Sequence, residues 1–348
     1  MPPRPITAEQ AKAAQAAVND GCTLTEVARN LGIARSTLRE HMARATSEQD
    51  RELPSSIELP TFPDEDIPVE QIIDHMAQRF AKRQASYDAH TWFPVKIKES
   101  KPIGVLFVGD PHVDDDGCAW PILREHCEIA RKTQGLYAIN IGDSANWWTG
   151  RLIKKYADQE SSAKTARRLV EWLMLDSGVR WLLILCGNHD AWGEGSLLLQ
   201  QMAKRYGTRN LVCHDWEARF VLKFPNGSQS RVFAAHDFPG HSMWNPLHGN
   251  VKAAKFGNDI DVLVCGHRHN YAVSQWELPE QGHAPLMVRV RGYKHLDDYA
   301  RRLGLQEQQE GQSILVIFDP NAKTRAGRAQ AFVDVAQGAD YLTWLRSR

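Results

Sequence analysis

Five short apolar runs recur along the part of the chain that follows residue 100. They span residues 103–108, 136–141, 181–186, 232–234 and 261–265. Runs of this length predict buried strands, although periodicity alone does not exclude a short helix. Each run is followed by polar side chains of the kinds that bind metals. Because the carboxyl ends of neighbouring strands meet at one edge of a sheet, we expect these side chains to converge there.

The clusters that follow the runs share a high content of carboxylate, amide and imidazole groups. They read Asp110-Pro111-His112, Gly142-Asp143, Gly187-Asn188-His189-Asp190, Ala235-His236-Asp237 and Gly266-His267-Arg268-His269. One cluster alone is equally consistent with a loop or a turn, because short motifs often match by chance. Five clusters in this order, each behind a predicted strand, predict a site for a pair of divalent metal ions. Oxygen and nitrogen ligands without thiolate suit borderline-to-hard metals.

The order of the clusters resembles that of the calcineurin-like binuclear metallophosphoesterases, whose pattern is D-x-H, GD, GNH[DE], H and GHxH. With the flanking strands, the resemblance covers about residues 93–320. It implies an α+β fold, a two-sheet β-sandwich flanked by helices, with the metals at the strand ends. It also implies two divalent ions, with Mn²⁺ expected first and Fe, Zn²⁺, Mg²⁺ or Ni²⁺ as alternatives.

The same resemblance assigns roles to individual residues. One metal is expected on Asp110, His112 and His269, and the other on Asn188, His236 and His267, with the Asp143 carboxylate bridging both. His189 matches the catalytic histidine of the family, which stabilises the transition-state phosphate or protonates the leaving group. Two metals about 3.5–4 Å apart stabilise both the attacking and the leaving oxygen of a phosphate. The predicted reaction is therefore hydrolysis of a phosphate ester.

Two departures from the pattern bear on the substrate. Ala235 stands before His236 where many members have glycine, and His241 and His248 are nearby rivals for this ligand position. After Asp143 the chain continues Ser-Ala-Asn-Trp-Trp, whereas the protein phosphatases of the family continue Val-Asp-Arg-Gly with a phosphate-binding arginine. Asp190 also replaces the glutamate common in that branch. These departures favour a phosphodiesterase or nuclease over a phosphomonoesterase or protein phosphatase, which stays the alternative.

Three further side chains lie close to the clusters in the sequence. Trp147 and Trp148 either stack a base of a single-stranded substrate or belong to the core. Arg268 lies between His267 and His269, so it is expected to point away from the metals on an alternating strand.

The N-terminal residues predict a small all-α domain. Residues 8–20 are rich in alanine and end at Asn19-Asp20-Gly21, a helix stop. The segment from Thr23 to Met42 resembles the helix-turn-helix of resolvases and small repressors, with Gly32 at the turn. The second helix would then enter the major groove of DNA. Its candidate contacts are Arg35, Ser36, Thr37 and Arg39, with Glu40 beside them.

Charge does not distinguish DNA binding from protein contact for this domain. Residues 1–50 carry six basic and six acidic side chains. Because affinity for nucleic acid depends on neutralising phosphates, we expect weak and salt-sensitive binding by the domain alone. The alternative is a helical bundle that contacts protein. A fusion of this kind resembles phage- or prophage-encoded members of the family.

A linker and one helix are expected between the two domains. Residues 53–68 are rich in proline and acidic side chains, the composition of an extended linker. Residues 69–89 place apolar side chains at helical spacing, which predicts an amphipathic helix that packs on the catalytic domain or on a second copy. All eleven tryptophans lie at or after Trp92. The expected domains are therefore 1–50, 51–92 and 93–348.

Global properties exclude several classes of protein. No apolar stretch reaches the length of a membrane span, and the start of the sequence lacks the apolar core of a signal peptide. The six cysteines form no Cys-x-x-Cys pair, so reduced thiols in a cytoplasmic protein are expected. Nucleic acid is the expected partner, as substrate or as the target of the helix-turn-helix. A third interpretation is a DNA-binding adaptor whose phosphoesterase domain is not catalytic.

Overall fold

The computed structural model describes residues 6–49, 60, 65–205, 211–257, 259–279, 282–295 and 309–348. The chain divides into two compact units, Met1–His75 and Met76–Arg348. The expected domain boundaries at residues 50 and 92 stand on either side of this division. The predicted linker, residues 53–68, lies largely outside the described residues. None of the helices in the described ranges has both the length and the apolar composition that crossing a membrane requires.

Among its described residues, the first unit contains the helices α1 (Ala8–Asn19), α2 (Leu24–Leu31) and α3 (Arg35–Gln49) and the first residues of α4 (Val69–His90). Helix α2 begins with a capping box in which the Thr23 side chain and Glu26 exchange hydrogen bonds, and it ends at Gly32, whose φ of 66° is left-handed. Such reciprocal caps satisfy backbone donors that a short helix leaves open. Helices α1, α2 and α3 share a small core, which consists of Ala14, Val27, Ala28, Leu38 and Met42.

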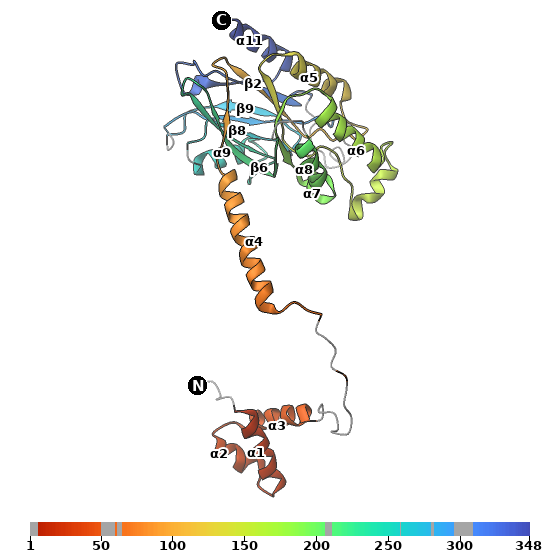
Figure 1. The fold of residues 1–348 in the computed structure, drawn as a ribbon, viewed down its shortest axis with the longest axis vertical. Helices are drawn as coiled ribbons and strands as arrows, with labels where there is room; N and C mark the ends of the chain where they lie inside the picture. The colour runs from red at the N-terminus through yellow and green to blue at the C-terminus, as the bar shows by residue number, and fades with distance from the viewer. Residues whose placement is uncertain are drawn as a thin grey trace. The chain divides into compact units, whose positions relative to one another are not determined.

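Two six-stranded sheets form the centre of the second unit (Figure 1). In spatial order, the first sheet contains β1 (Phe93–Lys96), β6 (Glu217–Lys223), β7 (Gln229–Ala235), β8 (Val262–Cys265), β10 (Leu286–Arg289) and β9 (Ala272–Gln275). The second contains β12 (Ala329–Phe332), β11 (Ser313–Phe318), β2 (Ile103–Val108), β3 (Leu136–Asn140), β4 (Trp181–Cys186) and β5 (Val212–Asp215). All five predicted runs are strands, which confirms that part of the sequence analysis.

Strand alternation explains why the sheets stack and why helices cover them. Along β2, Val105 and Phe107 belong to the core between the sheets, whereas Leu106 and Val108 belong to the core under the helices. Buried parallel strands are apolar on both faces for this reason. Strands β2, β3, β4 and β5 are parallel, as are β7 and β8. Their carboxyl ends are therefore the places where loops can carry a site.

Helices cover the outer faces of both sheets. The second sheet is covered mainly by α5 (Trp120–Lys132), α6 (Ala163–Glu171), α8 (Gly195–Arg205) and α11 (Val335–Ser347), and α9 (His248–Phe256) packs on the first sheet. Helices α5 and α11 contact each other above the sheet (Figure 1). The remaining elements are α4 (Val69–His90), α7 (Asn188–Trp192) and the short turns η1 (Gly150–Ala157), η2 (Trp172–Asp176) and η3 (Ala326–Arg328). The expected two-sheet core flanked by helices is thus confirmed.

A chain of polar groups crosses the interface between α5 and the second sheet. His126 Nδ1 lies 2.7 Å from the Tyr293 hydroxyl, which lies 2.5 Å from Ser313 Oγ. Burial lowers the pKa of His126 to about 4, and the charge of Asp334 only partly opposes this. In the folded protein His126 therefore stays neutral at pH values where an unfolded histidine is already protonated.

Acid should destabilise the protein partly through His126. Between pH 6.5 and about 4 the unfolded chain binds a proton at this residue that the folded chain does not bind, so stability falls as pH falls. The variant His126→Gln keeps a hydrogen-bonding group near Tyr293 but cannot bind this proton. Its free energy of unfolding should therefore fall less steeply with acid than that of the wild type, by up to ~1.4 kcal/mol per pH unit. Urea unfolding of both proteins across this pH range measures the difference. Equal pH slopes would contradict the assignment.

Candidate metal centre

Loops at the carboxyl ends of five strands bring the predicted side chains together. Asp110 and His112 follow β2, Asp143 follows β3, and Asn188 begins α7 directly after β4 and Gly187. His236 follows β7, and His267 and His269 follow β8. Both sheets therefore contribute to one cluster, which is where a sandwich with parallel strands can gather groups from distant parts of the chain.

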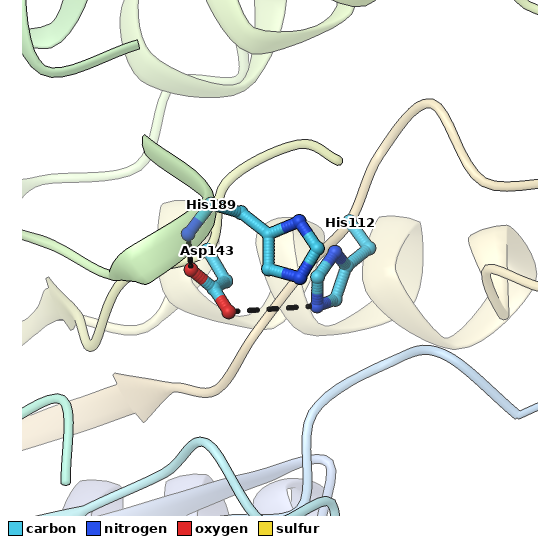
Figure 2. A group of neighbouring side chains, drawn as sticks. All are labelled: His112, Asp143 and His189. Atoms are coloured by element: carbon cyan, nitrogen blue, oxygen red, sulfur yellow. Dashed lines mark hydrogen bonds and ion pairs between the residues drawn. The ribbon is translucent and has the colours of Figure 1, made fainter. Parts of the chain in front are cut away.

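Two groups of side chains place ligand atoms within 4.8 Å of one another, and Asp143 belongs to both. The groups are His112, Asp143 and His189, and Asp143, His236 and His267. Figure 2 shows the first group, in which the imidazole rings of His112 and His189 meet edge to face beside the Asp143 carboxylate, with their planes at 89°. A carboxylate shared by two groups is the arrangement that a bridging ligand requires.

The second group is the tighter of the two. His236 Nε2 lies 3.0 Å from Asn188 Oδ1, 3.1 Å from His267 Nδ1 and 3.3 Å from Asp143 Oδ2. The other nitrogen of His236, Nδ1, lies 2.9 Å from the carbonyl oxygen of Ile141. A backbone carbonyl that accepts a hydrogen bond from one ring nitrogen orients the other nitrogen toward a metal. The rival residues His241 and His248 are exposed, and His236 alone of the three is in the cluster.

The first group has a wider environment that includes Asp110 and His269. Asp110 Oδ2 lies 3.6 Å from His269 Nε2, and the rings of His112 and His269 are 5.3 Å apart. His112 Nε2 lies 3.9 Å from Asp143 Oδ2. The ring of His189, which the motif assigns to catalysis, has a nitrogen within 4.8 Å of the Asp143 carboxylate. The structure therefore gathers His112, His189, His236 and His267 around this carboxylate, with Asn188 against His236, and with His269 against Asp110.

Burial makes the electrostatics of the cluster unusual. Burial raises the pKa of Asp110 to about 7, with Asp143 adding to the rise and His236 opposing it. Burial alone would lower the pKa of His236, but the charge and hydrogen bond of Asp143, together with Asp110, raise it to about 10. For Asp143, His236 and His112 outweigh burial and lower the pKa. A proton on His236 thus supplies positive charge between two buried carboxylates.

The residues fit a divalent cation. Asp110 Oδ1 and His112 Nδ1 are buried and have no hydrogen-bond partner within the described residues, although buried polar atoms are normally paired. Three lone-pair-bearing atoms approach His236 Nε2, an arrangement that requires a proton or a cation between them. The set of two carboxylates, one amide and four imidazoles suits Mn²⁺, Fe or Zn²⁺. Binding of a cation would displace the proton from His236.

The backbone of the loops is held in left-handed conformations at four of the expected ligands. The φ angles are 41° at His112, 51° at Asp143, 69° at His267 and 49° at His269. Each such residue costs about 1–3 kcal/mol and persists only where its surroundings enforce the conformation. Arg268 was expected on a strand, with its side chain on the face opposite the two flanking histidines. The prediction of a strand is wrong, because residues 266–269 form a loop after β8. Arg268 Nε instead donates to Asp237 Oδ2 at 3.1 Å.

Side chains behind the cluster lock the loops together. Asp190 accepts hydrogen bonds from the backbone nitrogens of Gly187 at 2.9 Å and Ser144 at 3.2 Å, and from Trp147 Nε1 at 3.0 Å. It therefore ties the loop after β3 to the loop after β4. The buried Arg289 donates to the carbonyl oxygen of Gly266 at 2.6 Å and to Asp237 Oδ1 at 3.1 Å. Supporting contacts of this kind orient ligands and tune their affinity.

His189 has a fixed orientation. Its backbone nitrogen donates to Asp143 Oδ1 at 2.8 Å, and its Nδ1 lies 2.7 Å from the carbonyl oxygen of Asn146 (Figure 2 draws the first bond). Burial is the main cause that lowers the pKa of His189. Since Nδ1 donates to a carbonyl, Nε2 carries the lone pair of the neutral ring. The imidazole can therefore accept or donate a proton at Nε2.

Four tryptophans bear on the site, and two of them were not predicted from the sequence. Trp147 and Trp148 are buried, which agrees with the core interpretation and not with stacking on a base. Trp192 is 46% exposed with its ring 4.3 Å from that of His189, and Trp216 is 39% exposed and 5.1 Å from His236. Trp192 lies three residues after His189, which is less than one helical turn. This spacing could have identified Trp192 as a neighbour of His189. No signal in the sequence indicated Trp216.

Comparison with known proteins identifies no family for this chain. No protein-family model and no curated protein sequence matches the chain. Among solved structures, the NAD nucleotidase (NadN) of Haemophilus influenzae aligns with 66% of this chain and 49% of its own, at 11% identity and a TM-score of 0.34. GAP50, the anchor in the inner membrane complex of Plasmodium, aligns with 70% of this chain and 95% of its own, at 12% identity and a TM-score of 0.32. The chain spans about half the length of the nucleotidase.

Gly142→Ala should reduce metal binding. The φ of Gly142 is +111°, and a Cβ atom there would lie 2.7 Å from both His236 Nδ1 and the backbone nitrogen of Gly187. The methyl group would displace His236 from the carbonyl that orients it. Gly227→Ala is the matched control, because its φ of +84° is also left-handed but its surroundings are open. Metal content after dialysis against Mn²⁺ should fall in the first variant and not in the second; equal contents would contradict this account of the loops.

Proposed function

We propose that the chain is a metal-dependent phosphodiesterase that acts on nucleic acid. The observation that carries the proposal is that His112 from one sheet and His236 and His267 from the other share the buried Asp143 carboxylate. A pair of divalent ions at such a site polarises phosphate oxygens and supplies an activated water near neutral pH. The ligand order resembles that of the calcineurin-like metallophosphoesterases, which supports hydrolysis as the reaction.

The site residues would have three roles: holding each ion, bridging the two ions, and transferring a proton. Asp110, His112 and His269 would hold one ion, Asn188, His236 and His267 the other, and Asp143 would bridge them. His189, oriented by the Asn146 carbonyl, would stabilise the developing charge on the phosphate or protonate the leaving oxygen through Nε2. The environment of His189 suits this role, because a rigidly held imidazole needs no reorganisation during proton transfer.

Several features favour a diester in nucleic acid over a phosphate monoester. No arginine stands among residues 144–148, directly after Asp143, to bind the extra charge of a monoester, and Arg268 is already paired with Asp237. Trp192 presents an exposed indole beside His189, and stacking on an aromatic side chain suits an unpaired base of any sequence. A monoesterase, including a protein phosphatase, and a non-catalytic adaptor are the alternatives that the experiments below test.

The N-terminal unit is proposed to bring the enzyme to DNA. Helices α2 and α3 are joined by a turn at Gly32, and Arg35, Ser36 and Arg39 are exposed at the start of α3, with Thr37 partly buried. In helix-turn-helix proteins this part of the second helix contacts base edges in the major groove. Exposed arginines at these positions are therefore the candidate DNA contacts.

Hydrolysis of a model diester tests the proposed reaction. With Mn²⁺, the wild type should hydrolyse bis(p-nitrophenyl) phosphate faster than p-nitrophenyl phosphate, and Asp143→Asn should lose activity because the bridging charge is gone. His189→Gln should retain bound metal but lower kcat ~10²–10⁴-fold, the usual contribution of general acid–base catalysis. Loss of metal in His189→Gln would instead make His189 a ligand.

The remaining outcomes of this assay separate the alternatives. A preference for the monoester would contradict the diesterase proposal and favour a phosphatase. Bound metal without hydrolysis of the diester, the monoester or DNA would favour the non-catalytic adaptor. A protein that binds no metal would favour it as well.

DNA binding by the full-length protein tests the N-terminal proposal. Arg35→Ala and Arg39→Ala should each weaken binding to duplex DNA, and an arginine that contacts phosphate should lower the slope of log K against log salt by about 1. Lys12→Ala on α1 is the control with the same change of charge. Fluorescence anisotropy over a series of salt concentrations measures both effects. Equal affinities for all four proteins would contradict the proposed contacts.

A further inference from the structure

Helix α4 exposes an apolar face along its whole length. None of the residues of Val69–His90 is buried. Five large apolar side chains are between 47% and 69% exposed: Val69, Ile72, Ile73, Met76 and Phe80. The apolar face of a surface helix normally packs on a core, and most of the stability of helices in proteins comes from such packing. The exposed face of α4 is therefore available to a partner.

The spacing of the exposed side chains indicates what kind of partner fits. Val69, Ile73, Met76, Phe80, Arg83 and Tyr87 follow one another at alternating intervals of four and three residues. That is the repeat of the core positions in a two-stranded coiled coil, in which a second helix packs along the seam. The helix is about 33 Å long at 1.5 Å per residue. The seam has one polar core position, Arg83.

Charge along α4 selects the direction of the partner helix. The acidic Glu70 and Asp74 lie in the first two turns of the helix, whereas the basic Arg79, Lys82 and Arg83 lie from its middle onward, followed by Asp88. A parallel pair would place Arg83 against the partner's Arg83 in the core, where like charges repel. An antiparallel pair would place each basic half beside an acidic half. We propose that α4 pairs antiparallel with the α4 of a second copy of this chain, with Met76 and Phe80 at the centre.

A membrane surface fits this helix less well than a second copy. Helices that lie on membranes carry many Lys and Arg residues on the polar face. In α4 three acidic side chains, Glu70, Asp74 and Asp88, balance the three basic ones. Opposite charges in opposite halves complement a second copy of the same helix and give no net attraction to an anionic surface.

A cavity at the end of α4 lies where the antiparallel partner would end. Arg83, Ser86, Tyr87 and His90 line it from the helix, and Cys213, His214 and Asp215 line it from β5, with a volume of about 260 Å³. In the antiparallel register, Val69 of the partner subunit lies opposite Tyr87. The apolar start of one helix would therefore enter the cavity beside the other.

The mass of the full-length protein in solution tests the pairing. Sedimentation equilibrium should give twice the 39.3 kDa of the chain for the wild type. The variant Met76→Asp/Phe80→Asp should give the mass of one chain, because it buries two charges at the centre of the seam. Gln78→Asp/Ala85→Asp, on the opposite face of the helix, is the control and should stay dimeric. A monomeric wild type, or a dimer that survives the first variant, would overturn the proposal.

Cross-linking tests the direction. In a background with Cys22→Ser, which removes the exposed native thiol, chains carrying Ile73→Cys are mixed with chains carrying Arg83→Cys. Oxidation of the mixture should give a disulfide-linked dimer, since these positions face each other in the antiparallel register, and each variant alone should give little. Efficient cross-linking of either variant with itself would show a parallel pair and overturn the antiparallel proposal. Circular dichroism of each variant verifies that the chain is folded.

Discussion

The buried carboxylate of Asp143 is the constraint on which the site depends. Its Oδ1 accepts the backbone hydrogen bond of His189, and its Oδ2 faces His236 and His112. A buried, ionised carboxylate is costly unless positive charge compensates it. Protonated His236 provides that charge in the protein alone, and cations can replace the proton. The loops around Asp143, with their left-handed residues and the hydrogen bonds to Asp190, are arranged to hold this charge in place.

Much of the fold and the cluster followed from the sequence, because both depend on local patterns. The apolar runs predicted β2, β3, β4, β7 and β8 to within a few residues, since buried strands must be apolar on both faces. The order of Asp, Asn and His behind those strands predicted which side chains would converge. The choice of His236 over His241 and His248 rested on the order of the clusters and on the preceding strand, and the structure brings His236 to the cluster.

Other features depend on contacts between distant segments, and local patterns in a single sequence do not predict such contacts. The left-handed conformations at His267 and His269 replace the expected strand because loops from both sheets meet there. Trp216 reaches the cluster because it directly precedes β6, whose Glu217 pairs with Ala235 at the end of β7. Trp147 is buried, and its indole nitrogen donates to Asp190. Apolar spacing predicted the helix from residue 69, but only the structure showed that its apolar face is exposed. Whether the N-terminal helices bind DNA depends on a partner that neither sequence nor fold contains.

Crystallography of the protein grown with Mn²⁺ tests the central claim most directly. An anomalous difference map should contain two peaks about 3.5–4 Å apart. One should lie between Asp110, His112 and His269, the other between Asn188, His236 and His267, and each should be in contact with Asp143. A map with no peak, or with a single peak away from Asp143, would contradict a binuclear centre built on this carboxylate.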